Sequence, residues 1–76
     1  MVVTLGDMNP GQSGKVEWID GRGGVYKRLL DMGLTPGSRI ELRRVAPLGD
    51  PIEIKVKGYS LSLRKNEAQM ISVALA

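Results

Sequence analysis

The stretch 25–38 constrains this chain more than any other, because it predicts a short helix with a defined stop. Val25, Leu29 and Met32 fall at helical spacing and form one apolar stripe. Gly33 follows at once, where a glycine can take the left-handed conformation that closes a helix without a Cβ clash. We therefore expect the helix to end at this glycine.

A tight turn is predicted directly after that helix. Leu34 is placed to supply the apolar contact that accompanies a glycine cap. Thr35–Ser38 fits a type II turn, in which Pro36 fixes φ and Gly37 takes the positive-φ position. Because almost every other apolar run is typical of a strand, this helix is predicted to be the single plug against which a small sheet closes.

The other apolar runs are short and mostly alternate with a period of two, which is typical of half-buried strands. A tight hairpin turn is expected at Lys57–Gly58 or Gly58–Tyr59, and one helical or 3₁₀ turn within Lys65–Gln69, around Ala68. The first run reads as an edge strand or an arm laid across the core. The expected strand segments are Val2–Leu5, Lys15–Asp20, Arg39–Ala46, Ile52–Lys57, Tyr59–Arg64 and Met70–Leu75. The prediction is one mainly β domain over 1–76, a small barrel of about five antiparallel strands with the helix inserted after the first long strand.

Strict alternation also predicts which side chains point inward. It places Val16 and Trp18 on one face of their strand, with Trp18 as a core or rim residue. It places Ile40 and Leu42 inward in the strand after the turn, and Val45 outward.

Composition excludes most catalytic chemistry. The chain has no cysteine and no histidine, so it lacks the usual thiol–imidazole nucleophile pairs and the commonest ligands of transition metals. Its eight acidic residues are scattered singly, and oxygen ligands alone favour hard ions bound weakly. We expect no enzyme activity and no tightly bound cofactor; at most, a divalent transition metal would bind weakly.

Charge is distributed unevenly along the chain, whose net charge is +3. Residues 1–38 hold four basic and four acidic side chains, whereas residues 39–76 hold seven basic and four acidic. A basic half suits an acidic protein surface, nucleic acid or anionic lipid headgroups, but the favoured interpretation is a solvated face that keeps the domain soluble. No apolar run is long enough to cross a bilayer and no signal layout opens the chain, so a cytoplasmic protein without membrane insertion is expected.

Two local signals for nucleotide or nucleic-acid binding are weak. The loop 21–24 lies where phosphate-cradling loops lie, but Tyr26 stands where the third glycine would fall, which favours a flexible turn. Tyr59, between Lys57 and Arg64, is the only aromatic–basic cluster, and a packing role for this tyrosine is the favoured interpretation. No nucleic-acid partner is expected.

The flank of the predicted helix leaves two interpretations open. Tyr26 and Leu30 lie beside the apolar stripe rather than on it, so the apolar arc is wider than one-sided packing needs. This flank is either exposed to receive a partner, or covered because the sheet curls further round the helix.

An ordered set of motifs resembles the ferrous iron transport A family (FeoA). Residues 28–37, R-L-L-D-M-G-L-T-P-G, resemble the family's R-L-x-x-M-G-L-x-P-G signature. The set continues with A-P-L-G-D-P at 46–51, Gly58, L-S-L-R at 61–64 and E-A at 67–68, and it covers nearly the whole chain. The resemblance implies an SH3-like barrel with an inserted helix. It also implies an accessory role in prokaryotic ferrous iron uptake, with the cytoplasmic face of the B-type permease, a membrane GTPase, as the partner.

Docking on that permease is the function the resemblance favours, and the signature itself is largely scaffold. The candidate partner-binding residues are Tyr26, Arg28 and Leu30 on the helix, Pro47, Leu48 and Asp50 in the loop 47–51, and Arg64 and Lys65. The alternatives are a nucleic-acid-binding barrel and a stand-alone metal-sensing module related to the C-terminal domain of metal-dependent repressors. A weaker idea assigns Arg22 to GTPase activation, and the expected state is a monomer or weak homodimer.

Overall fold

The computed structural model describes residues 1–21 and 23–76. Arg22, named above as a candidate for GTPase activation, lies outside the described residues. The elements in chain order are β1 (Val2–Thr4), the 3₁₀ helix η1 (Leu5–Asp7), β2 (Ser13–Ile19), α1 (Gly23–Asp31), β3 (Arg39–Val45), β4 (Ile52–Val56), β5 (Tyr59–Leu63), α2 (Lys65–Ala68) and β6 (Ile71–Leu75).

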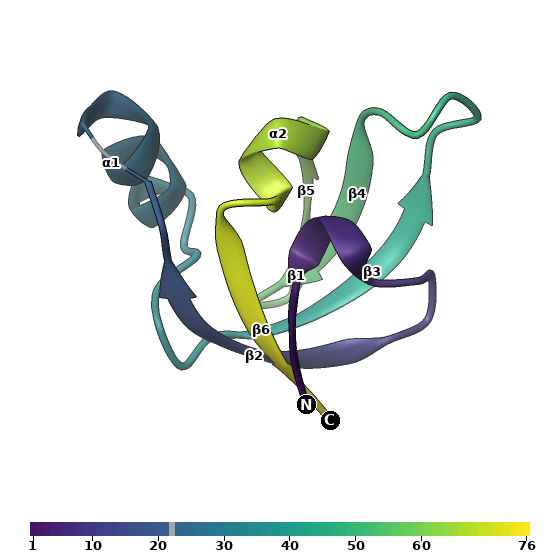
Figure 1. Cartoon of the computed structure of the whole chain (residues 1–76), viewed down its shortest axis with the longest axis horizontal. Coiled ribbons are helices and arrows are strands. Elements are labelled where there is room, and N and C mark those ends of the chain that lie inside the picture. Colours follow the sequence, from purple (N-terminus) through teal and green to yellow (C-terminus); the bar gives the residue numbers. More distant parts are fainter. Residues whose placement is uncertain (22) are drawn as a thin grey trace.

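The strands in the described part of the chain form one antiparallel sheet of six, in the order β1-β6-β2-β3-β4-β5. This confirms the mainly β prediction, and the run at Val2 is indeed an edge strand, paired with β6. The sheet curls into a small barrel, with both α-helices and the β3–β4 loop at one end and the two termini at the other (Figure 1).

The predicted stop of α1 is confirmed in detail. Gly33 has φ of 93°, and its N–H donates to the Leu30 carbonyl at 2.9 Å. The N–H of Leu34 donates to the Leu29 carbonyl at 3.1 Å. These two bonds make a Schellman motif, and both Leu29 and Leu34 are fully buried, so the cap anchors the end of the helix in the core.

The predicted turn follows and connects the helix to two strands. The N–H of Ser38 donates to the Thr35 carbonyl at 3.0 Å, and Gly37 has φ of 92°, as a type II turn requires. Val16 of β2 then bonds this turn twice, with its N–H to Ser38 O at 2.9 Å and its carbonyl to Gly37 N at 2.7 Å. The turn therefore fixes where β3 starts against β2.

The prediction that α1 is the plug of the barrel is wrong. Leu29 is buried, but Val25, one turn earlier, is 36% exposed, and α1 lies to one side of the sheet (Figure 1). The cap holds only the C-terminal end of α1 in the core, so its first turn extends past the sheet. Leu5 of η1 and Ala68 of α2, both fully buried, cover the open end of the sheet instead.

The core is otherwise made by the inward faces of the strands. It includes the buried side chains Met8, Val16, Ile19, Ile40, Leu42, Ile52, Ile54, Val56, Leu63, Ile71 and Val73. The alternation in β4, read directly from the sequence, accounts for three of these.

Two β-bulges overturn the predicted faces of β2 and β3. The pairing register shifts between Val16 and Trp18, and Trp18 is 57% exposed while Ile19 is buried. It shifts again between Leu42 and Arg44, and Val45 packs against the core rather than pointing outward. One extra residue in a strand reverses the side-chain alternation beyond it, so the residues after each bulge exchange faces.

The β4–β5 hairpin turns at the first of its two predicted places, Lys57–Gly58. Lys57 and Gly58 have φ of 51° and 85°, the pair of positive values that a type I′ turn needs. Tyr59, the first residue of β5, donates its hydroxyl to the Met32 carbonyl at the end of α1. Tyr59 is thus engaged in packing α1 against the hairpin, which agrees with the structural role favoured from the sequence.

Candidate docking face

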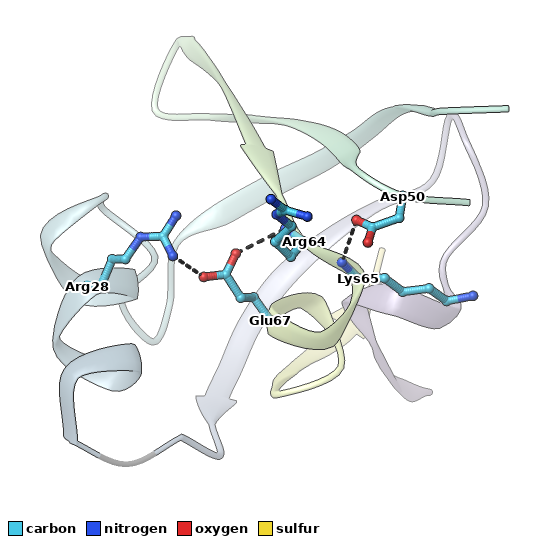
Figure 2. A network of polar contacts seen from close by, with 5 residues as sticks. All are labelled: Arg28, Asp50, Arg64, Lys65 and Glu67. Atoms are coloured by element: carbon cyan, nitrogen blue, oxygen red, sulfur yellow. Dashed lines mark hydrogen bonds and ion pairs between the residues drawn. The ribbon is translucent and has the colours of Figure 1, made fainter. Parts of the chain in front are cut away.

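Three segments singled out for partner binding meet around the short helix α2. Arg64 precedes this helix and Lys65 is its first residue. Figure 1 shows α2 between α1 on one side and the β3–β4 loop on the other. The side chains of Arg28 and Asp50 reach it from those two elements (Figure 2). We call this surface the docking face; it comprises Arg28, Asp50, Arg64, Lys65 and Glu67.

Glu67 organises the docking face. Its carboxylate is almost fully buried, and the residue is 5% exposed. One oxygen, Oε1, accepts the backbone N–H of Arg64 at 3.0 Å, and the other, Oε2, accepts Nη1 of Arg28 (Figure 2). A buried carboxylate is costly unless it is paired and hydrogen-bonded, and here both oxygens have a donor.

The pairing with Glu67 orients the Arg28 side chain toward α2. The side chain of Arg28 remains 58% exposed although its Nη1 is bonded. Its guanidinium has five N–H donors in a planar fork, so most of them stay available to another molecule. The ion pair therefore preorganises a donor group without using it up.

Asp50 ties the β3–β4 loop to the other side of α2. Its Oδ1 accepts the backbone N–H of Lys65 at 3.0 Å. Within residues 1–21 and 23–76, no carboxylate pairs with the side chain of Arg64 or Lys65, and both residues are exposed. Figure 2 shows the Lys65 side chain extending away from the network. The backbone of both cationic residues is thus fixed while their charges face solvent.

Two open hollows meet at Arg64. One, of about 320 Å³, is lined by Arg28, Pro51, Ser62, Leu63, Arg64 and Glu67. The other, of about 460 Å³, is lined by Asp50, Arg64, Lys65, Asn66 and Gln69. A protruding acidic or amide side chain of a partner would enter either hollow beside a fixed arginine.

The remaining candidates lie on α1 and in the β3–β4 loop. Tyr26 on α1 is 37% exposed and Leu48, in the β3–β4 loop, is 96% exposed. Pro47 precedes Leu48 in that loop and is also exposed. Leu30 is half-buried and packs against the core, so this part of the helix flank is partly covered by the barrel.

Glu67 was not among the candidate residues. A glutamate three positions after the residue that starts a helix is a capping-box signal, which accounts for its bond to the Arg64 N–H. No sequence signal links it to Arg28, 39 positions away. Only the packing of α1 beside α2 makes that ion pair.

The docking face consists of cations and of two carboxylates that each accept at least one hydrogen bond. Residues 1–21 and 23–76 contain no group of three acidic residues that could hold a metal ion. Within the same residues, no helix is long and apolar enough to cross a bilayer.

Comparison with known proteins identifies the family. The model of the FeoA domain matches residues 3–75. A Porphyromonas gingivalis protein named Fe(2+) transport protein A/Fe(2+) transporter FeoB fusion protein is 35% identical over 71 residues, which are 93% of this chain and 8% of that protein. The crystal structure of an iron uptake regulatory protein (FeoA) is 36% identical and superposes with a TM-score of 0.89, covering 100% of this chain and 99% of the other.

More distant structures agree in fold alone. Stenotrophomonas maltophilia FeoA complexed with zinc, described as a prokaryotic SH3 domain protein, is 22% identical, with a TM-score of 0.80 over 97% of this chain and 89% of that one. A manganese-dependent transcriptional repressor with manganese is 21% identical, with a TM-score of 0.91 over 99% of this chain and 37% of that one. The SH3-like architecture expected from the sequence is confirmed, as is its occurrence in metal-dependent repressors.

Proposed function

Because this chain belongs to the FeoA family, an accessory family of ferrous iron transport, we propose that it binds the B-type ferrous iron transporter through the docking face. The binding would occur on the cytoplasmic side and affect the assembly or activity of the transporter. The observation that carries the proposal is the convergence of Arg28, from α1, with Arg64 and Lys65, at the start of α2, around the buried Glu67.

A covalent fusion in a relative supports the choice of partner. The Porphyromonas gingivalis protein carries a region similar to this chain in one polypeptide with a transporter, and this chain corresponds to about 8% of its length. Fusion raises the effective concentration of two modules that act together. We assign the contact between the two modules to the docking face.

The geometry suits an acidic partner surface. Arg28 is held by Glu67, and the backbone of Arg64 and Lys65 is held by two carboxylates, so little backbone freedom is lost when a partner binds. Next to the open hollows, Arg28 and Arg64 present planar guanidinium groups and Lys65 presents a compact ammonium group. Leu48 lies in the loop that carries Asp50, and Tyr26 lies on the helix that carries Arg28; both have exposed apolar area of the kind that interfaces bury.

The proposal assigns no tightly bound metal and no catalytic step to this chain. Iron would pass through the transporter as cargo. Any divalent ion held by the chain itself would bind weakly, because its candidate ligands are scattered carboxylates.

Charge reversal tests the docking face. The double variant Arg64→Glu/Lys65→Glu should lose at least tenfold in affinity for the detergent-solubilised transporter, because like charges then oppose an acidic partner. The matched control, Lys15→Glu/Arg39→Glu, changes the net charge equally at exposed positions on strands β2 and β3. Its capture should match that of the natural chain in a pull-down. Equal capture by all three proteins would refute the assignment of this face.

A further inference from the structure

A second cationic surface lies on the outer side of strands β2, β3 and β4. Lys15, Arg39 and Lys55 are exposed on these strands, and Lys57 is exposed in the hairpin turn that follows β4. Lys15 stands directly opposite Arg39 in the β2–β3 pairing, and Lys55 stands opposite Glu41 in the β3–β4 pairing. We call these four cations the basic sheet face.

The charges of the basic sheet face have no partner in residues 1–21 and 23–76. The nearby carboxylate of Glu41 is instead bonded by Arg43 at 3.4 Å. Like charges directly opposite each other on a sheet destabilise it, so the Lys15–Arg39 pair does not serve stability. An open hollow of about 580 Å³, lined in part by Arg39, Lys55 and Lys57, lies on this side of the sheet.

Exposed apolar side chains lie on the same side of the sheet, toward the edge formed by β1. Lys15 pairs with Ala74 and Trp18 pairs with Ser72, and these two β6 residues lie on the same side because the Val73 between them is buried. Val2 of β1 lies opposite Ala74. Trp18 is 57% and Val2 is 50% exposed, so an aromatic and an aliphatic side chain lie on the same side of the sheet as Lys15.

We propose that the basic sheet face binds the anionic phospholipid surface beside the transporter. The proposal rests on the function proposed above, because a domain docked on a membrane transporter lies within reach of the headgroups, and a relative carries the two in one chain. Cations near an anionic membrane surface are attracted by its potential, and tryptophan is the aromatic side chain suited to the headgroup region. Both features occur here on one side of one sheet.

The same features fit a nucleic acid less well. Binding of single strands relies on several aromatic side chains that stack successive bases among the cations. Here Trp18 lies on the same side of the sheet as Lys15, and the hydroxyl of Tyr59 is bonded to the end of α1. Nucleic-acid binding is therefore the alternative that the experiment has to distinguish from lipid binding.

Vesicle sedimentation and fluorescence test this proposal without the transporter. The natural chain should bind vesicles of phosphatidylcholine mixed with phosphatidylserine, and not vesicles of phosphatidylcholine alone, with an affinity that falls as salt rises. Trp18 is the only tryptophan of the chain, so its emission reports contact on the side of the sheet that carries Lys15. Brominated lipid in the phosphatidylserine vesicles should quench it.

Two neutralised variants with the same net charge locate the contact. Arg39→Gln/Lys55→Gln/Lys57→Asn should lose about a hundredfold in vesicle affinity, at about fivefold for each cation removed. The control Lys27→Gln/Arg64→Gln/Lys65→Gln removes the same charge elsewhere and should lose less than about fivefold. Asn is chosen at position 57 because it tolerates the positive φ of this turn.

Several results would overturn the proposal. They are no binding to phosphatidylserine vesicles, equal losses in both variants, an unquenched Trp18, and tighter binding to a single-stranded oligonucleotide than to vesicles. Capture of the transporter in detergent, without anionic lipid, is a separate measurement. If that capture fails, the proposed function is wrong; if it succeeds while vesicle binding fails, only the lipid surface is wrong.

Discussion

The docking face and the basic sheet face are both cationic, but they are built in opposite ways. Around Glu67 the Arg28 guanidinium is bonded to a carboxylate of α2, and the backbones of Arg64 and Lys65 are bonded to the carboxylates of Glu67 and Asp50. On the outer side of β2, β3 and β4 the cations follow from strand alternation, and Lys15 faces Arg39 without an intervening acid. One surface therefore has a paired guanidinium and two held backbone positions, whereas the cations of the other have no ion-pair partner in residues 1–21 and 23–76.

This difference predicts two kinds of recognition. A guanidinium that is already oriented beside a hollow favours a partner with a complementary acceptor, because less freedom is lost on binding. Unpaired charges on long side chains favour a partner whose charge is itself spread out, and such binding weakens with salt. The two proposed occupants, a transporter surface and a lipid surface, differ in the same way.

The largest expected effect comes from removing the anchor of α1. Leu29→Ala should lower the free energy of unfolding by about 2–5 kcal/mol, because Leu29 is fully buried where the helix cap enters the core. Denaturant unfolding measures this change. Val25→Ala, one turn away on the exposed part of α1, should change it by less than about 0.5 kcal/mol. Equal effects would mean that α1 is held along its whole length.

A middle-sized effect should follow from removing the carboxylate that organises the docking face. Glu67→Ala leaves the Arg64 N–H and the Arg28 guanidinium without their acceptor, which should cost about 1–3 kcal/mol in unfolding free energy. Glu67→Gln should cost less, because an amide oxygen can still accept the Arg64 N–H. The exposed Glu17→Ala is the control, with a change within about 0.5 kcal/mol. If Glu67→Gln were as harmful as Glu67→Ala, the ion pair with Arg28 would dominate rather than the cap.

The smallest expected effect concerns the basic sheet face, and it is a gain in unfolding free energy rather than a loss. Lys15→Gln removes one of two like charges that face each other, so it should raise the free energy of unfolding by about 0.2–1 kcal/mol at low salt. The gain should vanish at high salt, where exposed charges are screened. Lys27→Gln, on α1, should show no such salt-dependent gain. A loss of stability in Lys15→Gln would show that this lysine has a stabilising contact.

Much of the fold follows from conformational preferences and residue patterns that can be recognised in short stretches of the sequence. The cap at Gly33, the turn at Pro36–Gly37 and the hairpin at Lys57–Gly58 depend on φ preferences of single residues. The inward face of β4 depends only on period-two alternation. The family signature is made largely of these same residues, which explains why it identifies the barrel so well and says little about docking.

The candidate site was predictable in its pieces and not in its assembly. Arg28, Asp50, Arg64 and Lys65 were each singled out, but the carboxylate that joins Arg28 to α2 was not. A contact between residues 39 positions apart depends on how the barrel sets α1 beside α2. Leu30, expected on the same flank as Tyr26, turned out to be partly covered for the same reason.

The amino-acid sequence alone determined the caps, the turns, the strand alternation and the absence of thiol and imidazole chemistry. The tertiary structure alone decided where the two bulges fall, which side of the sheet Trp18 takes and which carboxylate Arg28 meets. The physical reason is the range of the interactions. Backbone preferences act between neighbours in the chain, whereas a bulge or a buried ion pair forms only when a distant strand or helix is already in place.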